Sequence, residues 1–294
     1  MDWLHWISDQ AMEKLLHTLD ITVPAELSRR YWGAGDSKPR NKHKFYISDY
    51  RALCLVTGAI RYALREEADV YYRGQARDCT KWKLRPSLYR YVKSGEEIEP
   101  LNSAIQLLLN RIKGHFDISG ARESEREALA QHYGMRTRWL DIADNMQTAM
   151  WFAYDATMNT IADDCDGISI DGQHDESVGF IVVLAVPTAG SKTTEKVNVL
   201  DLRTKSSDWL RPHVQQAFVM MKEDPGKELG DLSAYHVLTM VVPKVLLKLW
   251  SNYENIPHSY MYPPAALDRG KYLWLKGLKD LDELGIDYKQ FISR

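Results

Sequence analysis

One run of nine residues without a polar side chain constrains the fold more than any other part of this 294-residue chain. Val178 to Val186 reads VGFIVVLAV and is followed by Pro187. Its length and its β-branched residues are typical of a central strand that is buried on both faces. Such a strand needs a partner on each side and layers that cover both faces. The chain therefore has to build a sheet of several strands with helices packed on it.

The remaining patterns supply both kinds of element. Alternating or β-branched segments predict further strands at 69–75, 197–200, 217–221 and 237–242. Apolar residues at steps of three and four predict helices from Ser48 to Glu67, over 95–116, from the Ser124/Glu127 capping box to Tyr133, from Met146 onward, and over 244–252. The fold class is therefore α+β, with a mixed or antiparallel sheet flanked by helices.

The chain divides into two parts on the same evidence. Residues 1–47 carry helical apolar spacing and then Gly, Pro and basic residues, which predicts an N-terminal helical arm and a loop. Residues 48–294 hold the predicted sheet and form the main domain. Within it, residues 160–177 are rich in Asp, Gly and Ser and are expected to be an exposed connection.

The composition argues against a disordered chain and against a protein that binds nucleic acid or acidic lipid through its overall charge. A hydrophobic content of 45% with 27% charged residues is typical of a globular protein. A net charge of −2 provides no overall field that would draw the chain onto nucleic acid or acidic lipid. Such contact would need a local basic patch, and the alternative for a basic segment is an ordinary solvated face. The candidate segment contains Arg77, Lys81, Lys83, Arg85 and Arg90.

The three cysteines, Cys54, Cys79 and Cys165, lie far apart and lack metal-ligand spacing. They indicate neither a disulfide framework nor a metal site. The first residues have no secretory signal pattern, and no segment has the roughly 20 apolar residues of a membrane span. We therefore expect a cytoplasmic protein without a bound metal or a membrane partner.

Polar residues gather at three places next to predicted buried segments. Arg73 and Gln75 share a face at the end of the strand 69–75, where Arg73 could bind a pyrophosphate or instead pair with an aspartate. Gln75 could bind a carboxamide or ribose, or be an ordinary turn amide. The second cluster follows the helix that begins at the capping box, and the third opens the strand 217–221. These clusters are the stretch QHYGMRTRWLD from Gln131 to Asp141, and the pair Gln215 and Gln216.

Within the second cluster, His132 and Tyr133 combine a titratable imidazole with an aromatic face, which suits binding of ribose and a flat ring, or general base catalysis. A histidine satisfied within the core is the alternative. Arg138 and Asp141 could bind and orient a phosphate, or they could form an internal salt bridge that builds the loop. Trp139 and Trp151 are expected to lie in the core.

Several motifs, taken in order, resemble the FRG domain family. They are YRGQ at 72–75, LRPSLYR at 84–90, QHYG at 131–134 with TRWLD at 137–141, AMWFA at 149–153, QQAF at 215–218 and MYPPAALD at 261–268. The resemblance covers about residues 70–275. The chain departs from the family pattern at Tyr72, where the family name has Phe, at Met135-Arg136 and at Ala217.

A more distant resemblance is to the ADP-ribosyltransferases, which have a split sheet and a three-part NAD site. It implies NAD as substrate, bound by Tyr72, Arg73, Gly74, Gln75, Arg138 and Gln216. It implies catalytic roles for His132, Tyr133, Asp141 and Gln215. The late strand of such enzymes usually carries Glu, whereas this chain has Gln215 and Gln216, with Glu223 several residues on. Asp141 or Glu127 could take the role of that carboxylate.

The leading hypothesis is therefore an ADP-ribosyltransferase, a toxin or anti-phage defence effector, that modifies RNA or protein and has an antitoxin or chaperone partner. A metal-independent ribonuclease with His132 as base is the second hypothesis. The third is a nucleotide- or nucleic-acid-binding module without catalysis.

Overall fold

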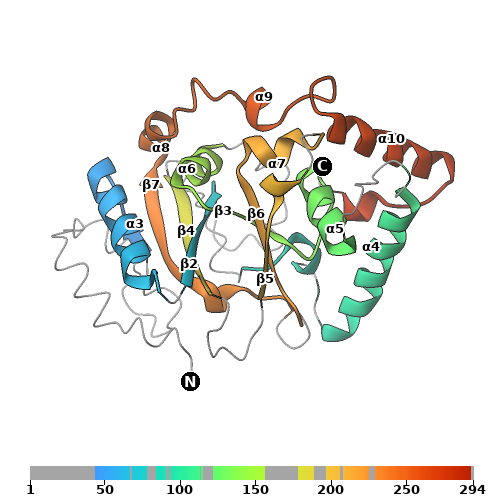
Figure 1. Ribbon diagram of the computed structural model, residues 1–294, viewed down its shortest axis with the longest axis horizontal. Coiled ribbons are helices and arrows are strands. Elements are labelled where there is room, and N and C mark those ends of the chain that lie inside the picture. Colours follow the sequence, from blue (N-terminus) through green and yellow to red (C-terminus); the bar gives the residue numbers. More distant parts are fainter. Residues whose placement is uncertain are drawn as a thin grey trace, which may run out of the picture.

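The computed structural model describes most of the chain from Lys44 onward (Figure 1). Several segments and residues of the sequence analysis lie outside the described residues. They are the predicted N-terminal helical arm, the connection 160–177, Cys79, Lys81, Lys83 and Cys165. The described ranges are 44–66, 68–77, 84–90, 92, 94–112, 114, 122–155, 178–188, 197–205, 208–224 and 229–292.

In this described part, seven strands form one mixed sheet in the order β1-β7-β4-β2-β3-β6-β5. The pair β1 and β7 is parallel, and the other five pairs are antiparallel. The sheet and its flanking helices confirm the predicted α+β class. The strands are β1 (Lys44–Tyr46), β2 (Ala68–Gln75), β3 (Leu140–Ala143), β4 (Val178–Pro187), β5 (Val197–Asp201), β6 (Ala217–Lys222) and β7 (His236–Pro243).

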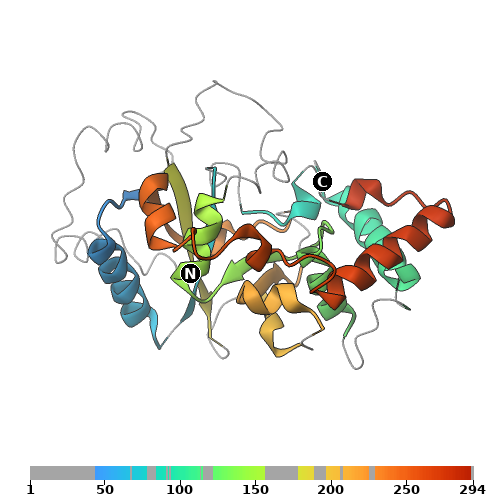
Figure 2. The ribbon, with the colours of Figure 1, turned by 90° about the horizontal axis from the view of Figure 1, so that it is seen from above.

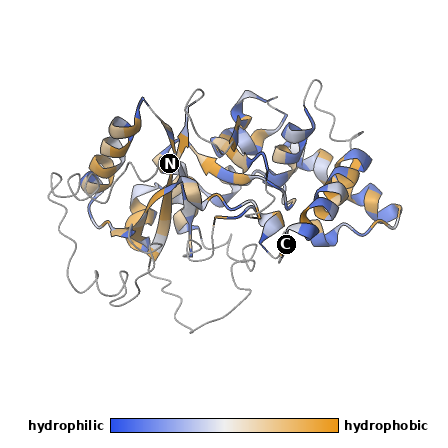
Figure 3. Ribbon diagram, turned by 90° about the horizontal axis from the view of Figure 1, so that it is seen from below, coloured by the Kyte–Doolittle hydropathy of each residue, from blue (hydrophilic) through white to orange (hydrophobic). Residues whose placement is uncertain are grey.

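Strand β4 is the central buried strand that its sequence predicts. Every residue from Val178 to Val186 is buried, and β4 pairs with β2 on one side and β7 on the other. The strands at the centre of the fold are predominantly hydrophobic in Figure 3. Trp139 and Trp151 are both 1% exposed, which confirms their predicted place in the core.

Helices cover the sheet and extend the fold to one side (Figures 1 and 2). Helices α3, α6 and α8 share a core with β2, β4 and β7. A second core joins α4, α5 and α10 at the opposite end of the molecule. No helix within the described ranges is long and apolar enough to span a bilayer. The helices are α3 (Tyr50–Leu64), α4 (Ile98–Ile112), α5 (Glu123–His132), α6 (Met146–Tyr154), α7 (Leu210–Val214), α8 (Lys244–Trp250), α9 (His258–Met261) and α10 (Arg269–Glu283).

The structure corrects several local predictions. Strands β1 and β3 lie in segments that the sequence predicts as loops, because β1 has three residues and β3 has four, too few to show a periodic pattern. Helix α3 is capped by Asp49 rather than Ser48. The predicted Ser124/Glu127 capping box is wrong. Glu125 instead accepts a hydrogen bond from the backbone N–H of Arg122 at 3.0 Å.

The sheet is split between β2 and β3. Among the described residues the two strands share one pair, Tyr72 with Ala143, whereas β2 pairs with β4 along all eight of its residues. Continuing the β2–β3 register would place Gly74 opposite Asp141. Instead, Nη1 of Arg73 donates to the carbonyl oxygen of Asp141 at 2.6 Å. A hydrogen bond from an arginine side chain thus takes the place of backbone pairing where the strands separate.

Helix α6 packs directly on the backbone of the sheet beside this split. A Cβ atom at Gly74 would collide with the carbonyl oxygen of Ala149 and would lie 2.7 Å from the amide nitrogen of Ala153. A Cβ atom at Gly179, on the neighbouring strand β4, would collide with the carbonyl oxygen of Ala153. Two glycines below two alanines therefore set the height of α6 above the sheet.

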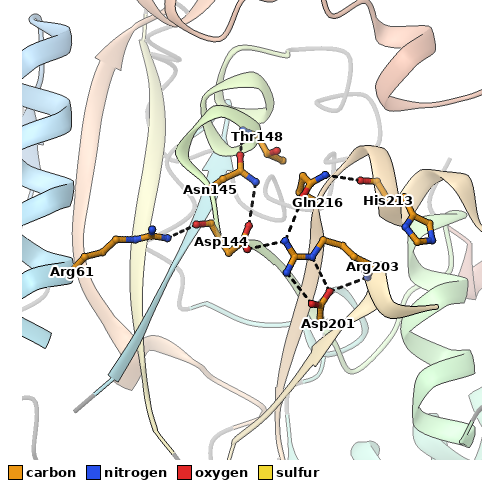
Figure 4. Close-up of polar contacts among 8 residues, drawn as sticks. All are labelled: Arg61, Asp144, Asn145, Thr148, Asp201, Arg203, His213 and Gln216. Atoms are coloured by element: carbon orange, nitrogen blue, oxygen red, sulfur yellow. Dashed lines mark hydrogen bonds and ion pairs between the residues drawn. The ribbon is translucent and has the colours of Figure 1, made fainter. Parts of the chain in front are cut away.

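A network of charged groups lies just beyond the single pair of β2 and β3 (Figure 4). Arg203, which follows β5, donates through Nη1 to Asp144 at 2.8 Å and through Nη2 to Asp201 at 2.8 Å. Asp144 follows β3, and its carbonyl oxygen accepts from Arg61 of α3. The network therefore ties α3 and β3 to β5, across the point where the ladder is weakest.

The packing of α6 yields a stability prediction with an internal control. We expect Gly74→Ala to destabilise the fold by about 3 kcal/mol, because the new methyl meets backbone atoms that cannot move without displacing α6. Gly58→Ala should stabilise it by about 0.5–1 kcal/mol, because Gly58 lies within α3 and an added Cβ meets no atom within 4 Å in the described part of the chain. Urea unfolding measures both. Equal effects at the two sites would contradict this packing.

Candidate functional site

A cavity of about 650 Å³ opens where β2 and β3 separate. Its walls come from the end of β2, the start of β3, the end of α5, the face of α6, the segment from α7 into β6, and the region around α9. The cavity gathers eight of the ten residues predicted to form the site. These are Tyr72, Arg73, Gly74, Gln75, His132, Tyr133, Asp141 and Gln215.

Arg73 is the central charged group of this cavity. Burial lowers the pKa of its guanidinium to about 10, while the neighbouring Asp141 opposes that shift. The guanidinium is therefore still charged at neutral pH. One Nη atom bonds the Asp141 carbonyl oxygen, and Nε is buried without a hydrogen-bond partner among the described residues. A charged group with an unused donor favours an anionic ligand.

The hydrogen bonds of Gln215 determine which nitrogen of His132 carries the proton. The side-chain amide of Gln215 donates through Nε2 to the carbonyl oxygen of Met261 at 2.8 Å, so its Oε1 faces His132. That Oε1 lies 3.0 Å from Nδ1 of His132 and can only accept. Nδ1 therefore carries the hydrogen, and Nε2 of the neutral ring has a free lone pair.

Nε2 of His132 faces the carboxylate of Asp141 at 3.5 Å. Neither Nε2 nor Oδ1 of Asp141 has a hydrogen-bond partner among the residues the structure describes. Burial lowers the pKa of His132, and the carboxylate of Asp141 opposes that effect. With the ring neutral, two acceptors face each other, and a bound molecule that supplies a hydroxyl or amide hydrogen would satisfy them.

Three other predicted residues line the cavity with restricted roles. The hydroxyl of Tyr133 donates to the buried carboxylate of Asp268 at 3.0 Å, so the hydroxyl is occupied. Tyr72 is 2% exposed and belongs to the core. Gly74 is required by the packing of α6, as described above.

Arg138 and Gln216 do not line the cavity, so the structure does not bring them together with the other eight predicted residues. Arg138 forms a salt bridge with Glu127, which is fully buried, with Nε at 2.9 Å from Oε2. This is the alternative of an internal ion pair, but with Glu127 as the partner instead of Asp141. Gln216 is exposed, and its Oε1 lies 3.4 Å from Nη1 of Arg203 (Figure 4).

Sequence reasoning missed Arg211 and Tyr262, which both line the cavity. The Arg211 guanidinium lies over the rings of Tyr133 and Tyr262, at 5.1 Å and 5.0 Å from their centroids. A signal existed for Arg211, because it precedes Gln215 by four residues and so lies on the same face of the helical turn. Tyr262 has no comparable signal, although it falls within a segment that resembles the family.

Unsatisfied polar atoms concentrate around this cavity. Within the described residues, atoms of this kind on the cavity wall include Nε of Arg73, Oε1 of Gln75, Nε2 of His132, Nε1 of Trp139, Oδ1 of Asp141, Nε of Arg211 and the hydroxyl of Tyr262. Buried polar groups in native proteins are normally hydrogen-bonded. Their gathering in one cavity indicates a ligand-binding site.

The charges around the cavity are predominantly positive. Its described wall holds five cationic side chains and two carboxylates, a net of +3, although the whole chain carries −2. Local positive charge of this kind favours anionic ligands. The cations are Arg73, Arg77, Arg90, Arg211 and Lys271, and the carboxylates are Asp141 and Asp155.

Comparison with known proteins gives one match. Neither a curated protein nor a solved structure matches the chain. The family model of the FRG domain matches residues 68–160, which include β2, α5, β3 and α6. That segment supplies Arg73, Gln75, His132 and Asp141 to the cavity, whereas Arg211, Gln215 and Tyr262 come from outside it. An FRG domain is therefore shown over residues 68–160, which confirms that part of the resemblance, whereas the later motifs, up to residue 275, lie outside the match.

Proposed function

We propose that this protein is an NAD-dependent ADP-ribosyltransferase that transfers ADP-ribose to a macromolecule, either RNA or protein. The observation that carries the proposal is the cavity in the split of the sheet. It brings Arg73 together with His132 and Asp141, and each of these three side chains offers a buried polar atom that has no partner within the described residues.

The donors and acceptors of the cavity suit a nucleotide that contains a diphosphate. Arg73 offers a charged donor for phosphate oxygens. Asp141 Oδ1 offers an acceptor for a sugar hydroxyl, and His132 Nε2 offers a second acceptor beside it. A volume of about 650 Å³ lies within the range of small-molecule sites, roughly 300–1,000 Å³.

Aromatic side chains supply surfaces for a flat ring. His258 and Tyr262 stack on each other with centroids 4.5 Å apart, and both line the cavity together with Phe152. Tyr133 can contribute its ring but not its hydroxyl, which bonds Asp268. The proposal therefore assigns stacking of nicotinamide or adenine to this group of rings.

The transfer breaks the bond between the nicotinamide nitrogen and C1′ of the ribose, and forms a bond from C1′ to a nucleophilic atom of the acceptor. Nicotinamide leaves with the bonding electron pair. The proton of the nucleophile goes to Nε2 of His132, whose lone pair is directed toward Asp141. Nδ1 stays bonded to Gln215, which holds the ring in place.

Asp141 is the proposed carboxylate of the reaction. Gln215 cannot serve as a base, because it is an amide and its Oε1 already accepts from His132. Glu127 is fully buried and bound to Arg138, so it is not free for the role. Asp141 lines the cavity and would stabilise the positive charge that develops at C1′.

A toxin or anti-phage defence effector follows from this activity by analogy alone. Modification of cellular RNA or protein would harm the producing cell, so we propose a neutralising antitoxin or chaperone partner and action in the cytoplasm. Expression of the active chain without that partner should slow growth, and expression of an inactive variant should not.

The first prediction concerns transfer itself. Purified protein incubated with labelled NAD and whole-cell protein and RNA should release nicotinamide and label one of the two fractions. His132→Gln should lower the rate by about 10²–10⁴-fold, the usual contribution of a general base. His213→Gln is the matched control, because His213 does not line the cavity and its Nε2 contacts the carbonyl oxygen of Lys205 at 3.1 Å.

Three outcomes decide between the hypotheses. Absence of both label transfer and nicotinamide release, with wild type matching Arg73→Ala, would contradict the proposal. Shortened RNA in reactions without NAD would support a ribonuclease that uses His132 as base. Thermal stabilisation by NAD or ADP-ribose without turnover would support a binding module, because a ligand that binds only the folded state raises its stability.

The second prediction is the acid limb of the pH–rate profile. His132 has to be neutral to accept a proton, so activity rises with pH through its pKa and is then constant. Burial lowers that pKa from 6.5, which places the midpoint of the limb below 6.5. Asp141 opposes the shift, so Asp141→Asn should move the midpoint to still lower pH, whatever it does to the maximum rate. Measurement of kcat/KM against pH tests this, and a midpoint that moves upward would contradict it.

A further inference from the structure

Arg211 is partly buried in the wall of the cavity opposite the half of the sheet that carries Arg73. It belongs to α7, which leads into β6, whereas Arg73 belongs to β2 across the split. Its Nη1 donates to the carbonyl oxygen of His132, and its guanidinium lies over the rings of Tyr133 and Tyr262. Nε is buried without a hydrogen-bond partner in the described part of the chain.

Tyr262 presents a second unused donor beside Arg211. The residue is partly exposed, but its hydroxyl oxygen is buried and bonds no other described residue. Burial, and to a smaller extent the charge of Asp155, raise the pKa of this hydroxyl well above its ordinary value. The hydroxyl therefore keeps its proton. The charges of Arg211 and Arg73 act on the pKa of Tyr262 in the opposite direction. All three side chains line the same cavity, and the Arg211 guanidinium lies 5.0 Å from the centroid of the Tyr262 ring.

We propose that Arg211 and Tyr262 form a second anion subsite that faces Arg73, so that the cavity binds a diphosphate in preference to a monophosphate. This inference rests on the proposed function for the identity of the nucleotide. Each half of the split sheet supplies one arginine, and a diphosphate has two charged groups to place between them. Neither residue lies within the segment that matches the FRG model.

The division of the unsatisfied atoms into hydrogen-bond donors and acceptors supports this assignment. The donors among them include Nε of Arg73, Nε of Arg211 and the hydroxyl of Tyr262, and phosphate oxygens accept hydrogen bonds without donating. A single phosphate could satisfy one arginine but would leave the unused donor of the other without an acceptor. The acceptor of Asp141 remains available for the sugar, and Nε2 of His132 remains available for the proton of the nucleophile.

The test compares ADP and AMP by titration calorimetry on the full chain. Wild type should bind ADP at least about tenfold more tightly than AMP, because the second phosphate gains hydrogen bonds to charged donors. Tyr262→Phe removes only the hydroxyl, and should lower the affinity for ADP about tenfold while changing that for AMP less. Tyr260→Phe is the matched control, since Tyr260 is 54% exposed and does not line the cavity.

Folding does not obscure this test, because the deleted hydroxyl has no partner within the described residues and Tyr262→Phe should unfold at the same temperature as wild type or higher. Equal affinity for ADP and AMP, no binding of ADP, or an unchanged ratio in Tyr262→Phe would each overturn the subsite. Transfer from NAD without this selectivity would overturn the subsite and leave the transferase standing. The selectivity without transfer would support the subsite and contradict the transferase.

Discussion

The separation of β2 from β3 after a single residue pair is the constraint on which the site depends. Backbone groups that no longer pair across a sheet need other partners, and here the guanidinium of Arg73 bonds the carbonyl oxygen of Asp141. The gap that opens holds the cavity, and α6 closes one side of it by resting on Gly74 and Gly179. Beyond the single pair, Arg61 of α3 bonds the carbonyl oxygen of Asp144, whose carboxylate pairs with Arg203 after β5 (Figure 4), so α3 stays tied to the β3–β6–β5 half of the sheet.

The arginines near the split fall into two groups, according to whether the guanidinium hydrogen-bonds a carboxylate or a backbone carbonyl oxygen. Arg138 faces a fully buried carboxylate, Glu127, and that pair builds the entry into β3. Arg73 and Arg211 are partly buried, yet each hydrogen-bonds a backbone carbonyl oxygen and not a carboxylate, and each keeps a buried Nε donor unused within the described residues. Taking a charge out of water is costly, and burial lowers the pKa of both groups. A bound anion would compensate that cost, which links the packing of the fold to the proposed chemistry.

Much of the fold could be predicted from sequence, and the reasons for the failures are physical. Strand β4 was predictable because nine residues without polar side chains leave few alternatives, whereas β3 has four residues with Asp141 among them. The convergence of Arg73, His132 and Gln215 followed from family motifs and not from spacing. The partner of Arg138 could not be found, because Glu127 lies eleven residues earlier on a helix and only the packing of α5 brings it near. Tyr262 depends on how the segment after α8 returns over the sheet, which no local pattern encodes.

The central claim is that the unsatisfied groups at the split bind one nucleotide between the two halves of the sheet. A crystal structure with ADP-ribose tests this most directly. The account predicts a diphosphate held between Arg73 and Arg211, with a ribose hydroxyl that donates to Oδ1 of Asp141. ADP-ribose bound elsewhere on the protein, or an empty cavity at a saturating concentration, would contradict it.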